Sequence, residues 1–256
     1  MSAVNPYAPP SSKVQDEPTG RDSHGFHPQG RKVDPIRGVK WITEAFSMVF
    51  AQLGTWMLIG LVMFVMMFVL FTLGNVQLLG MLRTVLMPVF LAGVIYAAAR
   101  QEGGERVRVG DLFAGFREKF APLALVGLLW SFIGIVASQV LLELTGIKSF
   151  MAWGPGVGLG LILLAFLFLL LLAPSFYALM WLAPALVLRH DLSPVEAMKN
   201  SFRITLRNSR AVIHYVVVGA IVMLIALIPF GLGLLIAFPV LLVSLYTAYR
   251  DLFIEP

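Results

Sequence analysis

The chain has 256 residues, of which 59% are hydrophobic and 13% are charged, and it carries a net charge of +5 and no cysteine. Soluble domains contain about 25% charged residues, so this composition excludes a single water-soluble core. The lack of cysteine excludes a disulfide framework, cysteine-ligated metal sites and thiol chemistry.

Residues 1–35 differ in composition from the rest of the chain. They contain six of the 15 prolines and few bulky apolar residues, which predicts a disordered tail. They also lack the apolar core of a secretory signal peptide. We therefore expect a cytoplasmic tail over residues 1–35 and an integral membrane helical domain over residues 36–254.

Apolar segments long enough to cross a bilayer follow this tail. A membrane core about 30 Å thick requires roughly 20 apolar residues of helix. The predicted spans are Trp56–Leu73, Thr84–Ala99, Pro122–Leu142, Val157–Leu188, Ala211–Ile228 and Leu232–Tyr249. The sequence thus predicts an all-α membrane protein with six transmembrane helices.

The fourth segment is long enough to be read either as two spans or as one. With six spans in total, 17 of the 19 Lys and Arg residues lie on one side, and only Arg83 and Lys148 lie on the other. Basic loops stay in the cytoplasm, so this asymmetry favours one long helix kinked at Pro174. It also places both termini in the cytoplasm.

An amphipathic segment precedes the first, third and fifth spans, at residues 36–53, 112–120 and 193–206. Each has a basic face and an aromatic or apolar face, which is typical of helices that lie in the headgroup layer. The third begins with Ser193-Pro194-Val195-Glu196, a capping box with proline in the first turn. We expect a threefold parallel repeat, in which an interfacial amphipathic helix precedes each transmembrane hairpin.

No local catalytic signature occurs in the chain, and no Asp or Glu lies near the centre of a predicted span. We therefore expect no catalytic residues, no cofactor, no metal site and no nucleic-acid partner. An enzyme would require a cluster on the cytoplasmic side, drawn from five residues: Asp111, His190, Asp191, Glu196 and Asp251.

Three stretches resemble an uncharacterised family of six-span inner-membrane proteins of proteobacteria. They are VGDLFAGF at Val109–Phe116, LSPVEAMKNSFR at Leu192–Arg203 and GLGLLIAFPVLLVSLYTAYRDLF at Gly231–Phe253. The family is more distantly similar to the membrane region attached to some glycerophosphodiester phosphodiesterases. The resemblance implies a bacterial inner-membrane location and six spans, and it brings no catalytic residues.

Two functional hypotheses follow. In the first, the protein is non-enzymatic. It organises membrane lipids, mainly anionic ones, or it binds a membrane protein partner or further copies of itself. Its candidate contacts are the basic residues of the amphipathic segments: Arg37, Lys40, Arg117, Lys119, Lys199, Arg203, Arg207 and Arg210. In the second, a permease or lipid-translocating protein has an apolar cavity among the last three spans, near Pro174, Tyr177 and Tyr246.

Overall fold

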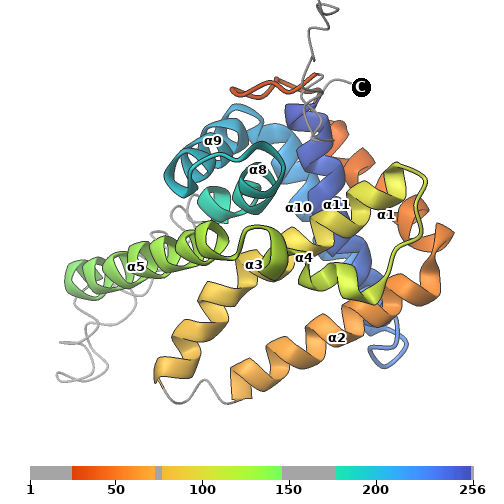
Figure 1. Ribbon diagram of the computed structural model, residues 1–256, viewed down its shortest axis with the longest axis horizontal. Helices are drawn as coiled ribbons and strands as arrows, with labels where there is room; N and C mark the ends of the chain where they lie inside the picture. The colour runs from red at the N-terminus through yellow and green to blue at the C-terminus, as the bar shows by residue number, and fades with distance from the viewer. Residues whose placement is uncertain (1–24, 73–76, 146–176, 255–256) are drawn as a thin grey trace, which may run out of the picture.

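The computed structural model describes residues 25–72, 77–145 and 177–254, and its elements are helices (Figure 1). In chain order they are α1 (Arg37–Ala51), α2 (Leu53–Thr72), α3 (Gln77–Glu102), the 3-10 helix η2 (Val109–Phe113), α4 (Ala114–Glu118), α5 (Phe120–Thr145), α8 (Ala183–His190), α9 (Pro194–Arg207), α10 (Ser209–Leu227) and α11 (Leu234–Phe253). An antiparallel bridge between Phe26 and Ile254 joins the start of the described chain to its end.

Five helices of the described chain are long and apolar enough to cross a membrane. They cover Leu53–Thr72, Gly80–Glu102, Phe120–Val140, Ser209–Leu227 and Leu234–Phe253. These correspond to the first, second, third, fifth and sixth predicted spans, with ends shifted by a few residues. The all-helical, multi-pass membrane architecture is therefore confirmed.

The predicted fourth span lies outside the described residues up to residue 176, and this part includes Pro174. In its described part, residues 177–180 are helical, Trp181 and Leu182 form a bend, and α8 then begins with Pro184 in its first turn. Proline has no N–H to donate, so it fits best in a first turn and removes a hydrogen bond when it lies within a helix. The described end of this segment is thus broken just before Pro184, whereas the predicted kink at Pro174 lies outside the described residues.

A side chain from α9 satisfies the backbone groups at this break. The Ser201 hydroxyl accepts a hydrogen bond from the Leu182 N–H (3.0 Å) and donates one to the Ala178 carbonyl (2.6 Å). Ser201 is fully buried. In an apolar environment an unpaired backbone group costs several kcal/mol, so this contact explains how the break is tolerated beside α9.

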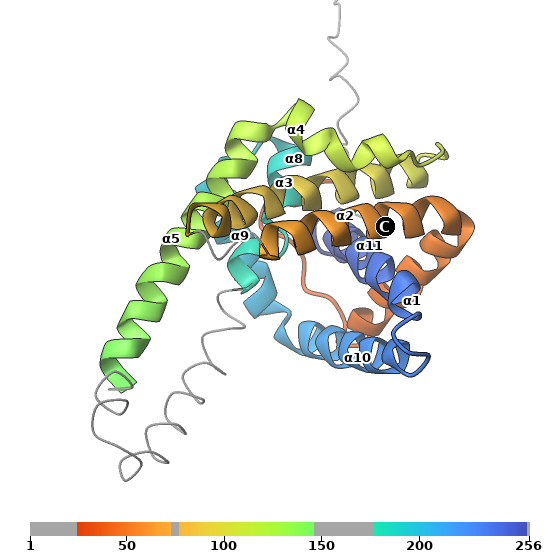
Figure 2. The same cartoon turned by 90° about the horizontal axis from the view of Figure 1, so that it is seen from below.

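The spans differ in how much protein surrounds them. In the most apolar stretch of α3 and of α11, 56% and 61% of the residues are buried inside the protein. The corresponding shares are 22% in α2, 22% in α5 and 17% in α10. Helices α3 and α11 are therefore the most enclosed spans of the described chain, and most residues of α2, α5 and α10 are not buried by other parts of it. Figures 1 and 2 show how these helices are arranged.

Close backbone packing joins α3 to the segment formed by η2 and α4. A Cβ atom added at Gly93 would lie 1.9 Å from the Leu112 carbonyl oxygen, and one added at Gly115 would lie 2.2 Å from the Val89 carbonyl oxygen. Both positions thus require glycine for this approach. In the structure the predicted amphipathic segment at residues 112–120 covers the end of η2, the short helix α4 and the first residue of α5, and η2 and α4 pack on α3.

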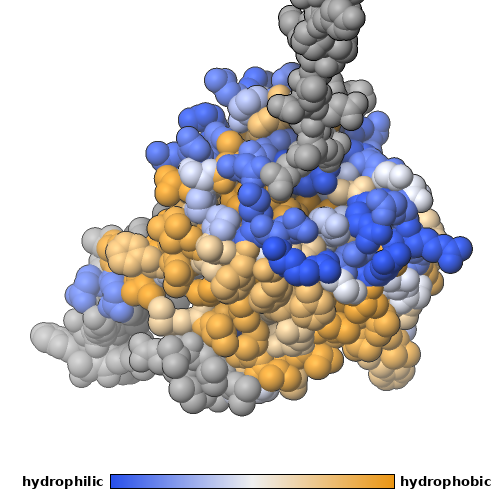
Figure 3. All heavy atoms as spheres, in the orientation of Figure 1, coloured by the Kyte–Doolittle hydropathy of each residue, from blue (hydrophilic) through white to orange (hydrophobic). Residues whose placement is uncertain are grey.

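The ends of several helices gather at one polar end of the molecule. Arg250 at the end of α11 pairs with Glu102 at the end of α3, and Lys119 at the start of α5 pairs with Asp191 after α8. Figure 3 shows hydrophilic residues concentrated at this end and a broad hydrophobic surface below it. This is the distribution expected of a protein whose polar end meets water at one membrane face.

Candidate lipid-contact surface and the ion pairs behind it

The start of α9 is set by local chemistry, as the sequence predicted. The backbone N–H of Glu196 donates to the Ser193 hydroxyl (3.3 Å), and that hydroxyl donates to the Glu196 carboxylate (3.0 Å). Pro194 occupies the first turn. One face of α9 is buried in the protein, through Ala197, Ser201 and Ile204 among others, so its opposite face is fixed toward the outside.

Four basic residues on the outer face of α9 and at the start of α10 form what we call the basic rim: Lys199, Arg203, Arg207 and Arg210. All four are exposed. Within the described part of the chain none of them has a carboxylate partner; the polar contacts of Arg203 and Arg207 are long ones, to the Asn200 amide (3.5 Å) and the Gly30 carbonyl (3.4 Å). Their charges are thus available to an external anion.

The basic rim borders an apolar surface directly. Arg210 lies in the first turn of α10, and Ile213, Val217 and Leu224 further along this helix are 60%, 52% and 65% exposed. An arrangement of this kind offers cations to a lipid headgroup and apolar side chains to its acyl chains.

Asn208 fixes the junction between α9 and α10. Its amide group donates to the carbonyls of Arg31 (3.0 Å) and Ile204 (3.1 Å), and its side-chain oxygen accepts from the Val33 N–H (2.8 Å). Asn208 is buried, with 4% of its surface exposed. The segment before α1 thereby holds the basic rim in place, a role that no sequence pattern had indicated.

Two of the eight predicted lipid contacts have carboxylate partners within the described chain. Arg37 donates to the Asp251 carboxylate (2.7 Å) and also pairs with Glu44, while Lys119 pairs with Asp191. The hydrogen bond to Asp251 raises the pKa of Arg37 above its ordinary value, against the opposing effect of burial. The other six, Lys40, Arg117 and the four residues of the basic rim, are exposed.

Asp251 is the centre of a buried ion-pair cluster. Its carboxylate accepts from Arg31 (2.5 Å), Arg37 (2.7 Å) and the Trp41 indole N–H (2.7 Å), and its side chain is 1% exposed. A buried carboxylate is tolerated only when donors replace its lost water. This cluster binds the end of α11 to α1 and to the segment before it.

The residues of the predicted cavity lie in different surroundings. Tyr246 is buried, and its hydroxyl donates to Glu102, which also pairs with Arg250. Tyr177 is 64% exposed, and its ring lies 6.1 Å from that of Trp130 on α5. Pro174 lies outside the described residues. Tyr246 is thus part of the polar end, whereas Tyr177 faces outward.

The acidic residues considered for an enzyme also divide by their contacts. Asp111 pairs with Arg100 (2.8 Å), Asp191 with Lys119, and Asp251 with arginines, while Glu196 caps α9. Across the described residues, no group of three His, Asp or Glu side chains lies close enough to hold a metal ion.

The chain matches no protein-family model, no curated protein and no solved structure.

Proposed function

We propose that this protein is a non-enzymatic, multi-pass protein of a bacterial inner membrane that holds anionic phospholipid at its cytoplasmic polar end. The observation that carries the proposal is the basic rim, whose four exposed cations lead directly into the exposed apolar face of α10. Each Lys or Arg near an anionic membrane surface contributes about 1 kcal/mol to binding. Four such residues on one edge therefore favour anionic over zwitterionic lipid.

The proposed orientation places the polar end in the cytoplasm. It holds both described termini of the chain, through the bridge between Phe26 and Ile254, together with the basic rim. Cytoplasmic loops carry an excess of Lys and Arg, which supports this assignment.

We further propose six spans arranged as three parallel units. Three contacts support this arrangement: α3 packs on the η2–α4 segment, α8 packs on α9, and α11 packs on α1. In each case the last helix of one proposed unit meets the opening segment of the next, and the third unit returns to the first. The contact between α11 and α1 carries the most weight, because these helices lie at opposite ends of the described chain, whereas the other two contacts join successive elements.

Native mass spectrometry of the purified protein tests the lipid proposal. We compare retention of phosphatidylglycerol and phosphatidylcholine by the wild type, by R203E in the basic rim and by R106E, which changes the net charge equally at an exposed residue outside the rim. The proposal predicts preferential retention of phosphatidylglycerol, reduced several-fold in R203E and largely kept in R106E. Equal retention by all three proteins would contradict it.

A further inference from the structure

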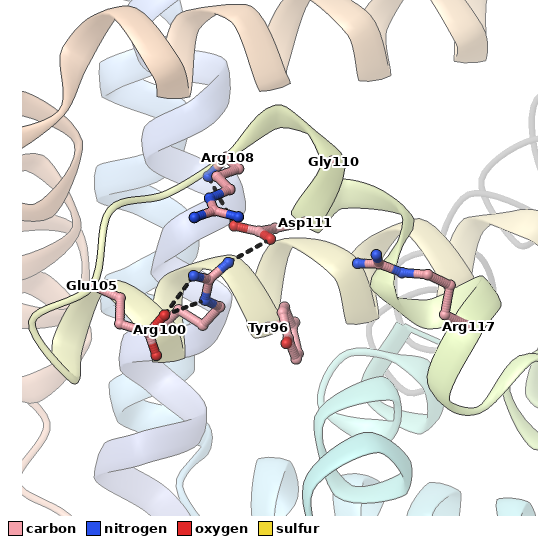
Figure 4. A pocket seen from close by; sticks show the side chains of 7 residues that line it. All are labelled: Tyr96, Arg100, Glu105, Arg108, Gly110, Asp111 and Arg117. Carbon is pink, nitrogen blue, oxygen red and sulfur yellow. Dashed lines mark hydrogen bonds and ion pairs between the residues drawn. The ribbon is translucent and has the colours of Figure 1, made fainter.

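A polar pocket of about 410 Å³ lies at the end of α3, apart from the basic rim (Figure 4). Its walls come from the last turns of α3, the loop that follows, and the segment formed by η2 and α4. Three arginines line it, namely Arg100, Arg108 and Arg117, together with Tyr96 and Asp111. The concentration of guanidinium groups in one concave site is the feature that requires an explanation.

Asp111 and Arg100 form a fixed wall of this pocket. One oxygen of the Asp111 carboxylate accepts from the Arg100 guanidinium (2.8 Å), and the other accepts from the Arg108 backbone N–H (2.8 Å). Asp111 is buried, with 3% of its surface exposed. Because both oxygens are engaged, this carboxylate holds the loop and Arg100 in place and leaves the two other arginines unneutralised.

The guanidinium groups of Arg108 and Arg117 have no carboxylate partner among the residues that the structure describes, and both residues are exposed. Figure 4 shows Arg117 extending from α4 toward Asp111, with Arg108 on the other side of that carboxylate. The Tyr96 hydroxyl also has no hydrogen-bond partner within the described chain. Glu105 pairs with Arg100 (2.5 Å), but its side chain is 58% exposed on a loop, so an incoming anion can displace it.

We propose that this pocket binds the phosphate group of an anionic phospholipid. Guanidinium groups donate pairs of parallel hydrogen bonds that match phosphate oxygens, and the volume lies within the range of small-molecule sites. The position suits a lipid, because α5 begins three residues after Arg117 and its first residue, Phe120, is 44% exposed. Arg117, Arg108 and the Tyr96 hydroxyl bind the headgroup phosphate, and the exposed apolar residues of α5 contact the acyl chains.

Binding of short-chain lipids to the full-length protein in detergent tests this site. The probes are dioctanoyl phosphatidic acid, dioctanoyl phosphatidylcholine and inorganic phosphate, each titrated by calorimetry against the wild type, R108Q/R117Q, R108K/R117K and R203Q/R207Q. We expect one phosphatidic acid per chain at the pocket, in addition to any lipid held at the basic rim. It should bind about tenfold or more weakly in R108Q/R117Q, since a tenfold change corresponds to the loss of a single charged hydrogen bond. R108K/R117K keeps the positive charge but lacks the paired donors, so its affinity for phosphatidic acid should lie between those of the wild type and R108Q/R117Q.

The control R203Q/R207Q removes charge from the basic rim, where the proposed function also places anionic lipid, and leaves the residues of the pocket unchanged. The phosphatidic acid held at the pocket should therefore bind to this variant with the same affinity as to the wild type, whatever is lost at the rim. The two proposals can therefore fail separately. Failure of the proposed function would appear in the retention of phosphatidylglycerol, and failure of the pocket would appear in the calorimetry of R108Q/R117Q. Inorganic phosphate binding as tightly as the lipid, and lost in R108Q/R117Q, would support a phosphate site supplied by a soluble ligand. Unchanged affinity in a folded R108Q/R117Q, or no saturable binding of either phosphate probe, would overturn the proposal.

Discussion

Some charged residues at the polar end form ion pairs that hold helices together, and others are exposed. Asp251 has three donors on its carboxylate, and Arg250 joins Glu44 to Glu102. These contacts connect α1, α3 and α11. The residues that remain free to bind an anion are those whose charges the protein itself does not neutralise.

Replacing Asp251 by Asn should destabilise the protein. The substitution removes the negative charge that compensates Arg31 and Arg37, whose side chains are 32% and 27% exposed. Breaking a buried pair typically costs about 3–5 kcal/mol, and because both arginines keep access to water we expect about 3 kcal/mol. Unfolding in detergent, followed by tryptophan fluorescence, measures this loss. E118Q, at an exposed position, should unfold as the wild type does, and an equally stable D251N would contradict the assigned role.

Stability should also depend on pH through His190. Burial, with a contribution from Arg189, lowers the pKa of His190 from 6.5 to about 4. Between these values the unfolded chain binds a proton that the folded protein does not, so the free energy of unfolding falls as the pH falls through this window. The ring lies against Phe26 (3.5 Å between centroids) and hydrogen-bonds to the Tyr249 hydroxyl (2.5 Å).

Melting temperatures at pH 7.5 and pH 5 measure this dependence. The wild type should lose more stability between these values than H190Q, which cannot bind the proton. H214Q is the matched control, because His214 is exposed, and it should behave as the wild type. An H190Q protein with the full wild-type pH dependence would show that other groups cause it.

The sequence located the basic residues but could not separate paired from unpaired ones. Arg37 and its partner Asp251 are 214 positions apart, and no local pattern reports a contact over that separation. The basic rim was predictable, because its residues follow the helical period of a segment whose start is marked by a capping box. Asn208 and Ser201 were missed because each acts on backbone groups of a distant segment.

At the scale of elements, amphipathic segments pack on the protein itself. The apolar face of α1 is covered by α10 and α11, and η2 with α4 covers α3. The sequence predicted helices at all three amphipathic segments, yet the middle one contains a 3-10 turn, and Gly93 and Gly115 permit close backbone contact between it, α4 and α3. A hydrophobic pattern predicts which face is apolar, but not whether lipid or another helix covers it.

Replacing Gly93 by Ala should weaken the contact between α3 and η2. The added methyl group would lie 1.9 Å from the Leu112 carbonyl oxygen, so the backbones must separate. Overpacking of this kind costs about 1–3 kcal/mol. Unfolding experiments in detergent should show this loss in G93A. In G54A, where nothing lies within 4 Å, alanine should leave stability unchanged or raise it slightly; equal stability of the two variants would contradict the close packing.

At the scale of the whole molecule, hydropathy was sufficient to predict an all-helical chain with several helices that can cross a membrane. Long apolar runs located five spans that the described structure contains as helices, because a bilayer requires every backbone group to be satisfied within the segment. The fourth segment was harder to interpret, since Pro184 breaks its described end and Ser201 from α9 compensates for that break. Tertiary contacts of this kind cannot be predicted from composition.

The central claim is that one polar end, bearing the basic rim, lies at the cytoplasmic membrane face. The chain contains no cysteine, so single cysteines report accessibility without background. K199C in the basic rim and R106C after α3 probe the polar end, and T72C probes the far end of α2. We predict that a membrane-impermeant maleimide labels K199C and R106C only in inverted vesicles, and T72C only in intact cells. Labelling of K199C and T72C from the same face would contradict the account.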